Sequence, residues 1–294
     1  MHSLTRKQLI LLVLLTLVWG LNWPVMKFGV TEFPALSFRA LSMLIGLPVL
    51  GLALIVFKVP FRVPRRHWAE LLLLAALNMV AWHALIIIAL KSLTGGRAAI
   101  LGYTMPIFSA VLGALFFGNR LLPRGWGGVA AAAIGVLLLL WHELTNLAGR
   151  PAGVVLALTA AAIWAVGTQL LRRTTLTVPT LTITFWMTAA TTVSMCALSL
   201  VFERTQWNPP SPAVWATIIY NALMIFVFAQ AAWFYLARSL PPVASTLSVM
   251  FIPVLGVFSG ALWLGEVLHW QDWTAVALMA VAIASVLLPA KARS

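Results

Sequence analysis

The residues of this chain that could do chemistry are polar and aromatic side chains set within long apolar stretches. In the first stretch, Trp19 and Trp23 are four positions apart, and Asn22 lies three after Trp19. A helix would therefore place all three close to one face. Pro24 lacks an N–H, so it should free the carbonyl of Gly20 to meet a substrate or a neighbour. This face could stack on and hydrogen-bond a small ligand, although the two tryptophans could instead serve packing or an interfacial aromatic belt.

A second group is centred on His83, the one histidine well inside an apolar stretch. Asn78 lies close to it, and Gln230 follows it by 147 positions. His83 could bind a carboxylate or take a proton, because imidazole titrates near neutral pH. A buried histidine that is hydrogen-bonded to another helix is the alternative. We predict that Asn78, His83 and Gln230 face a central space.

A third group combines aromatic and sulfur-containing side chains with prolines. Stacking and soft sulfur contacts suit a flat apolar ligand, although such a face is more often plain packing. Two prolines that are 147 positions apart should kink two helices at one depth and act as hinge-like gates. The predicted lining residues are Tyr103, Met105, Trp164, Met250 and Phe251, and the predicted hinges are Pro24, Pro106 and Pro253.

No catalytic or metal-binding arrangement accompanies these groups. The sequence has no Ser/His/Asp set, no paired catalytic carboxylates, no phosphate-cradling glycine loop and no Cys/His spacing typical of a metal site. The single cysteine, Cys196, excludes an intrachain disulfide. We therefore expect neither enzymatic activity nor a metal or other cofactor.

The elements that must position these side chains are helices in a membrane. The chain is 62% hydrophobic and 9% charged, with a mean hydropathy of +1.01, so one water-facing globule could not bury its apolar surface. Its net charge of +13 sits in short connections, which argues against nucleic acid as a partner. We predict an all-α integral membrane protein in the lipid bilayer. Its ten transmembrane helices should span 8–28, 34–57, 69–91, 98–117, 125–142, 152–171, 180–202, 213–236, 244–263 and 272–289.

An internal repeat divides the helices into two halves. Residues 92–126 recur as 239–273, with landmarks at a constant offset of 147, half of the 294 residues. At an offset of 145, Trp19 corresponds to Trp164. Five helices in each half is an odd number, so the second copy enters the membrane from the opposite side. We predict two inverted-topology five-helix repeats, 1–147 and 148–294, that form one membrane domain. Inverted repeats place a substrate site near the midplane and allow alternating access, which indicates a carrier.

The charges of the connections give an orientation. The side that holds the N-terminus carries 13 of the Lys and Arg residues, and the other side carries 6, with Lys27 and Arg39 among them. Since cytoplasmic loops are enriched in these residues, both termini are predicted to be cytoplasmic. The first apolar run is too long for a signal-peptide core and is read as a retained helix.

Several segments resemble the drug/metabolite transporter superfamily, EamA type. The segment Val18–Trp23 resembles the family's Trp-Gly-x-Asn opening, and Pro34 with Arg39 resembles its Pro…Arg pattern. Pro253 followed by Gly265-Glu266 is similar to the Pro and Gly-Glu of its ninth helix, whereas Gly118-Asn119 departs from the usual Gly-Glu. The resemblance covers nearly the whole chain.

This resemblance implies a ten-helix carrier of the bacterial inner membrane with a central cavity. In its tryptophan content and in the run from Leu17 to Trp23, the chain most resembles the aromatic amino-acid exporters of the superfamily. That likeness implies export of aromatic amino acids and related metabolites. A carrier for a nucleobase, a vitamin or a drug is the alternative. A channel or a membrane-embedded enzyme is less favoured, because His83 alone titrates near neutral pH at mid-membrane.

Overall fold

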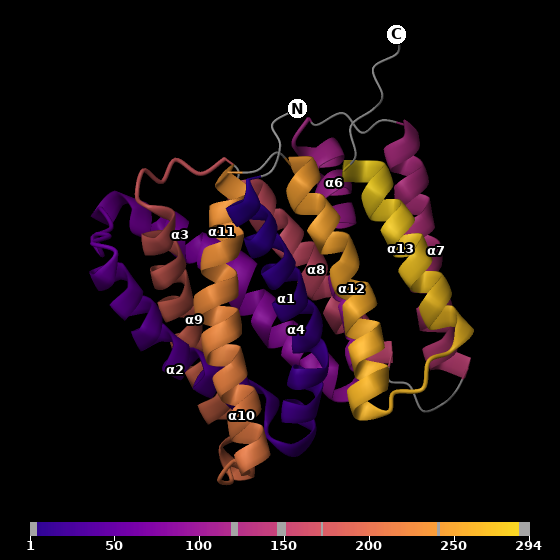
Figure 1. Cartoon of the computed structure of the whole chain (residues 1–294), viewed down its shortest axis with the longest axis horizontal. Helices are drawn as coiled ribbons and strands as arrows, with labels where there is room; N and C mark the ends of the chain where they lie inside the picture. The colour runs from indigo at the N-terminus through magenta and orange to yellow at the C-terminus, as the bar shows by residue number, and fades with distance from the viewer. Residues whose placement is uncertain (1–4, 119–122, 146–150, 172, 240–241, 288–294) are drawn as a thin grey trace.

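Every regular element in the described part of the chain is helical, as the sequence predicts. The computed structural model describes residues 5–118, 123–145, 151–171, 173–239 and 242–287. Figure 1 shows the helices side by side, running roughly along one direction between an upper and a lower end of the molecule. They are α1 (Arg6–Glu32), α2 (Ala35–Val56), η1 (Arg65–His67), α3 (Trp68–Ala75), η2 (Ala76–Val80), α4 (Ala81–Ser92), α5 (Gly95–Gly102), α6 (Met105–Phe116), α7 (Pro123–Thr145), α8 (Pro151–Leu171), α9 (Thr180–Phe202), η3 (Arg204–Gln206), α10 (Pro212–Tyr220), η4 (Asn221–Ala229), α11 (Gln230–Ser239), α12 (Pro242–Leu264) and α13 (Trp270–Leu287).

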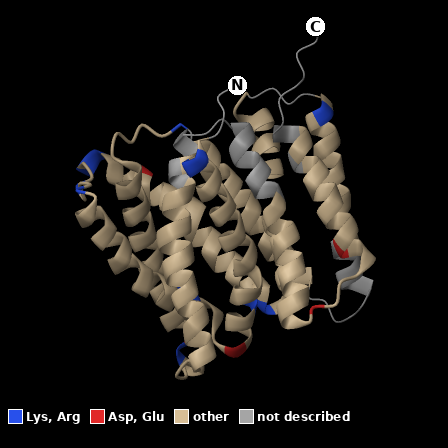
Figure 2. Cartoon of the chain, viewed as in Figure 1, with Lys and Arg blue, Asp and Glu red and all other residues tan. Residues whose placement is uncertain are grey.

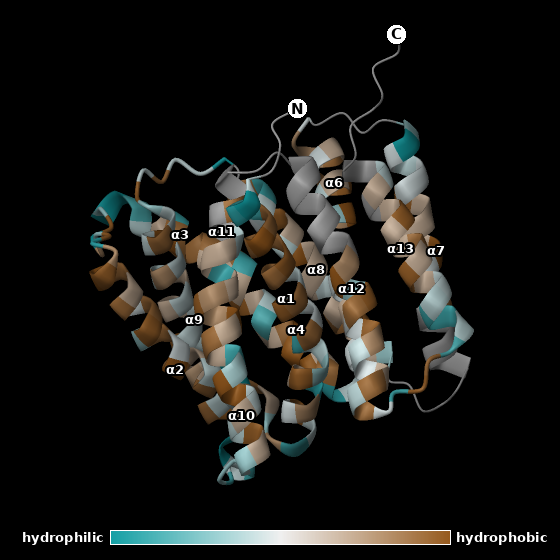
Figure 3. Cartoon of the chain, in the orientation of Figure 1, coloured by the Kyte–Doolittle hydropathy of each residue, from teal (hydrophilic) through white to brown (hydrophobic). Residues whose placement is uncertain are grey.

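The helices are built to cross a membrane. Charged residues gather near the helix ends (Figure 2), and apolar residues cover the middle (Figure 3). Large apolar side chains such as Leu52, Val201 and Leu262 are exposed, as lipid-facing positions require. Among the residues that the structure describes, seven segments are long and apolar enough to span: Arg6–Glu32, Ala35–Val56, Arg65–Ser92, Gly95–Phe116, Pro151–Leu171, Thr180–Phe202 and Pro212–Trp233. Phe251–Leu264 is a shorter apolar helix. The total of ten spans stays a prediction.

α2 and α9 form a pair that is tied at both ends. At one end, the Glu203 carboxylate accepts the backbone N–H groups of Leu36 at 3.0 Å and Ser37 at 2.7 Å. This carboxylate satisfies two free donors at the start of α2 and complements the helix dipole. At the other end, the Trp186 indole N–H donates to the carbonyl of Phe61 at 2.7 Å. These contacts therefore hold α2 along α9.

Other helices approach closely through glycine. α1 packs along α12, α8 packs against α4 and α6, and α7 packs along α13. A Cβ at Gly20 of α1 would lie 2.6 Å from the Cβ of Leu255 in α12. Gly256, the next residue of α12, faces Ala99 and Trp23. The backbones of α1, α5 and α12 are thus drawn together.

Two membrane segments contain a π-helix near their middle. η2 lies between α3 and α4, and η4 lies between α10 and α11. π-helical turns are rare and often accompany functional sites. Both therefore mark places to search for ligand-binding side chains.

The segment Gly95–Phe116 is interrupted before its proline. α5 ends at Gly102, the next two residues form a turn, and α6 begins with Pro106 in its first turn. In contrast, α12 continues through Pro253. A helix break thus accompanies Pro106 and not Pro253, and the paired kinks stay a prediction. The sequence offers a reason: Gly102 weakens the helix, whereas its counterpart 147 positions later is Val249.

Candidate functional site

The strongest candidate site surrounds the fully buried ring of Phe226 in η4. The His83 ring, from α4, meets it edge-on with 5.3 Å between centroids. The guanidinium carbon of Arg39, from α2, lies 5.5 Å from the centroid of the same ring. The fold thus brings an imidazole and a guanidinium to one aromatic side chain deep in the protein.

Arg39 is the residue that the sequence analysis missed. The count of loop charges includes it, and the structure corrects that assignment, because Arg39 lies within α2 and is 1% exposed. One terminal nitrogen donates to Oδ1 of Asn221 at 3.3 Å, and the other lies 2.9 Å from Sδ of Met26. Position alone could not reveal this burial, since a cation one turn into a helix usually reaches the interface.

His83 and Asn22 are buried with unsatisfied polar atoms. Each is 5% exposed, and Nδ1 of His83 and Oδ1 of Asn22 have no hydrogen-bond partner. The alternative of a histidine held by another helix therefore finds no hydrogen bond in its favour among the described residues. Asn78 differs, because its Nδ2 donates to the carbonyl of Leu74 at 3.0 Å, and its side chain packs against Gly167.

The aromatic residues of α1 point to two different neighbours. Trp19 stacks at a tilt on Trp233 of α11, with 5.5 Å between ring centroids. Trp23 meets the edge of Tyr103 at 6.4 Å. Trp23 is 4% exposed and lies against Gly102, so in this conformation it is a packing residue between helices.

The remaining predicted lining residues lie in several different places. Met105 is buried beside the turn that follows α5, and Trp164 is half-buried on α8. Gln230 begins α11, and no hydrogen bond joins it to His83. Phe251 is 62% exposed and makes no ring contact with the other predicted residues among those the structure describes. The side chain of Met250 lies outside the described residues, as does Arg172.

The predicted hinges occupy different settings. Pro24 is buried within an unbroken α1, and Pro253 is buried within an unbroken α12. Pro106 is half-buried beside the break between α5 and α6. A role as gates stays a prediction for all three.

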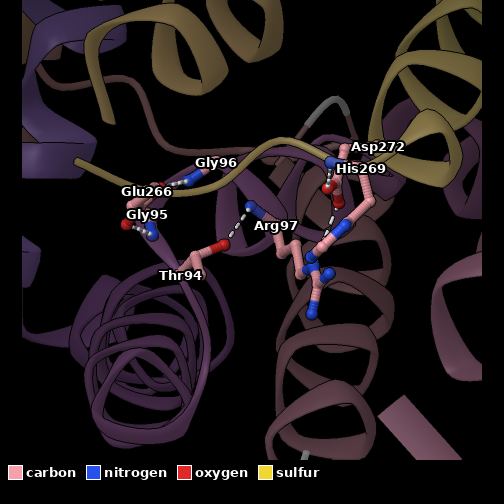
Figure 4. A network of polar contacts seen from close by, with 7 residues as sticks. All are labelled: Thr94, Gly95, Gly96, Arg97, Glu266, His269 and Asp272. Carbon is pink, nitrogen blue, oxygen red and sulfur yellow. Dashed lines mark hydrogen bonds and ion pairs between the residues drawn. The ribbon is translucent and has the colours of Figure 1, made fainter. Parts of the chain in front are cut away.

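A polar network joins distant parts of the chain at the lower end of the molecule (Figures 1 and 4). The Glu266 carboxylate, just after α12, accepts the N–H groups of Gly95 at 2.6 Å and Gly96 at 3.2 Å. Nε of Arg97 forms an ion pair with Oδ1 of Asp272 at 3.0 Å. Both acids therefore hold the start of α5 against the connection between α12 and α13.

Lys27 also binds backbone at this end. Its ammonium donates to the carbonyls of Leu90 at 2.9 Å and Lys91 at 3.3 Å, where α4 ends. The side chain thus caps a helix C-terminus, a favourable place for a cation.

Comparisons with known proteins agree with this architecture. The model of the EamA-like transporter family matches residues 6–141 and again residues 151–288. A solved structure superposes with a TM-score of 0.70 at 20% identity, covering 96% of this chain and 98% of the other. The fold is therefore a known one.

The relatives are transporters by name. YoaV of Bacillus subtilis, an uncharacterized transporter, is 24% identical over 88% of this chain and 89% of its own. YedA of Escherichia coli, an uncharacterized inner membrane transporter, is 28% identical over 93% and 88%. A probable amino-acid metabolite efflux pump of Salmonella typhimurium is 27% identical over 90% and 89%. With both halves matched by one family model, the chain belongs to the EamA-like transporter family.

Proposed function

We propose that this protein is a carrier that exports aromatic amino acids and related aromatic metabolites across the bacterial inner membrane by alternating access. The observation that carries the proposal is the double match to one transporter family, once in each half of the chain. A carrier built of two homologous halves can rock about a site between them.

Equivalent features of the two halves support an inverted repeat. Among the described glycines, Gly118 and Gly265 have positive φ values of 68° and 63°, and they are 147 positions apart. The π-helices η2 and η4 lie in corresponding segments. Equivalent helices also have equivalent neighbours. Under the repeat α1 corresponds to α8 and α12 to α6, and α1 packs on α12 as α8 packs on α6. Likewise α4 corresponds to α11, and α4 packs on α8 as α11 packs on α1.

Aromatic side chains from both halves support an aromatic substrate. Phe226 and Tyr103 are buried, and Trp19 and Trp233 are partly buried and in ring contact with each other. Rings of this kind hold a flat ligand by offset and edge-to-face contacts. The relative in Salmonella typhimurium that is named a probable amino-acid metabolite efflux pump supports amino acids or their derivatives as the cargo class.

The polar network of Figure 4 supports a gate at the lower end. It links residues of the first half, Gly95 to Arg97, to Glu266 and Asp272 of the second. With the predicted orientation this end faces away from the cytoplasm. The conformation described here is then closed to the outside, and export requires these contacts to part.

Flux measurements in proteoliposomes test the proposal. Radiolabelled tryptophan or phenylalanine should enter vesicles that contain the protein faster than empty vesicles, with saturation and with acceleration by unlabelled substrate on the opposite side. Equal flux in protein-containing and empty vesicles would sink the substrate assignment. Single-channel currents would contradict a carrier. Saturable flux of a labelled nucleobase, vitamin or cationic drug that unlabelled aromatic amino acids do not inhibit would favour the alternative cargo.

A further inference from the structure

Arg39 is a buried cation without a counter-ion. Among the described residues it forms no ion pair, and its contacts are the neutral side chains of Asn221, Met26 and Phe226. Its Nε–H has no acceptor in the part of the chain that the structure describes. Arginine keeps its proton in proteins, so this site carries a positive charge that no acidic side chain among the described residues neutralises.

Such an arrangement is costly and requires a reason. Ionisable groups inside a membrane protein are normally paired, and one side of an aromatic ring replaces a carboxylate only in part. The amide contact with Asn221 is long, at 3.3 Å, and uses only one of the guanidinium nitrogens. The fold therefore holds the guanidinium in place without satisfying it.

The proposed repeat places a neutral residue at the position of the second half that corresponds to Arg39. At the offset of 145 that relates the first helices of the halves, position 39 corresponds to Thr184 in α9. Thr184 is 1% exposed, and its hydroxyl donates within its own helix to the carbonyl of Thr180 at 2.9 Å. A small side chain that hydrogen-bonds within its own helix thus occupies the equivalent position, and the charge at Arg39 is specific to one half.

Two further polar side chains with unpartnered atoms lie on helices that contact Arg39 or its aromatic neighbour Phe226. His83 lies against the same Phe226 ring and has an unpartnered Nδ1. Asn22, with an unpartnered Oδ1, lies one helical turn before Met26, the residue that touches Arg39. The Nε–H of Arg39, Nδ1 of His83 and Oδ1 of Asn22, which have no partner among the described residues, are together complementary to an anion that carries its own donor. The forked guanidinium is suited to a carboxylate or a phosphate, and of these two an amino acid carries the carboxylate together with a donor.

We propose that Arg39 binds the carboxylate of the transported substrate, with His83 beside it. This assignment rests on the proposed function as a carrier, and it names the chemical group that the carrier requires of its cargo. Substrates with a free carboxylate bind, whereas amines that lack one do not.

Ligand-induced stabilisation of the purified protein tests the assignment. The panel contains phenylalanine, 3-phenylpropionate, which lacks the ammonium, phenylalanine amide and phenethylamine, which lack the carboxylate, and inorganic phosphate as a second anion. The two carboxylates should raise the unfolding temperature of the wild type, and the amide and amine should not. Arg39→Gln should weaken carboxylate binding at least tenfold. The carboxylate affinity of Arg39→Lys should lie between those of the wild type and Arg39→Gln. Stabilisation by phosphate alone would overturn the carboxylate assignment.

Stability without ligand separates binding from a structural role. Removing an unpaired buried charge should leave the unfolding temperature of Arg39→Gln equal to or above that of the wild type. Thr184→Ala, at the equivalent place in the second half, is the matched control and should keep carboxylate binding. A large loss of stability in both Arg39 variants, or wild-type carboxylate binding in Arg39→Gln, would overturn the proposal.

The two proposals fail in different ways. If phenylalanine is transported and Arg39→Gln transports it equally well, the carrier function stands and the role of Arg39 is refuted. If aromatic amino acids are not transported but other carboxylates bind in an Arg39-dependent manner, the aromatic cargo is refuted and the role of Arg39 stands. If the wild type binds no carboxylate, the assignment of Arg39 is refuted.

Discussion

Nε of Arg97 lies 3.0 Å from Oδ1 of Asp272, although 175 residues separate them in the chain. Their side chains are 12% and 5% exposed, so the pair is largely withdrawn from water. It connects the start of α5 with α13 and thereby joins the two halves at one end of the molecule. Any opening at this end has to separate these two charges.

Breaking this pair should favour the open state. Arg97→Gln leaves Asp272 without its cation, a change that costs about 3–5 kcal/mol for a buried pair and less for one partly exposed. We expect faster access to α5 from the lower end. In a Cys196→Ser background, the reporter Ala99→Cys, buried against Gly256, should react several-fold faster with an impermeant maleimide. Arg204→Gln, at an exposed site in η3, is the control, and equal labelling in both variants would contradict a gate here.

Removing the cap of α2 should destabilise the protein. Glu203→Ala removes the acceptor of two backbone N–H groups and the negative charge that complements the dipole of α2. These losses should lower the free energy of unfolding by about 1–3 kcal/mol. Glu203→Gln keeps one acceptor and should cost less. Unfolding midpoints in detergent measure both. Glu32→Gln, an exposed acid at the end of α1, should change nothing, and an equal effect there would argue against capping.

Gly20 should resist any enlargement. A Cβ at this position would meet Leu255 at 2.6 Å, so Gly20→Ala must push α12 away and should cost about 1–3 kcal/mol by overpacking. Gly127 of α7 has nothing within 4 Å of a built Cβ. Gly127→Ala should therefore be neutral or gain up to about 1 kcal/mol from helix propensity. The thermal unfolding midpoints of both variants show whether the steric contact with Leu255 or the helix propensity of alanine has the larger effect on stability.

Trp19 and Trp164 should matter for transport more than for stability. Trp19→Ala and Trp164→Ala should each lower the flux of tryptophan in proteoliposomes while elution profile and unfolding temperature remain near wild type. Trp19→Phe should retain part of the flux, because a ring still faces Trp233. Trp263→Ala, at a 60% exposed position of α12, is the control. Normal transport by both alanine variants would show that these tryptophans do not line the substrate path.

The sequence by itself determined the helices and the family. Long apolar runs and Pro or Gly breakers are local properties, so the predicted stretches agree with the observed helices, as at 180–202 for α9. The 147-residue repeat is equally readable, and the family model matches each half. The motif Gly265-Glu266 could be seen as well. What Glu266 binds could not, since its partners Gly95 and Gly96 lie 171 and 170 positions away.

Only the tertiary structure decided which polar groups come together. Arg39 reads as a charge near a helix end, and its burial depends on Met26 and on Phe226, which lies far along the chain. The sequence likewise treats Pro106 and Pro253 alike, whereas one lies beside a helix break and the other does not. Apolar periodicity specifies that a residue is within a helix. The depth at which that residue is buried, its neighbours and its hydrogen-bond partners are decided only when helices from both halves pack. Those contacts join residues that no local sequence pattern relates.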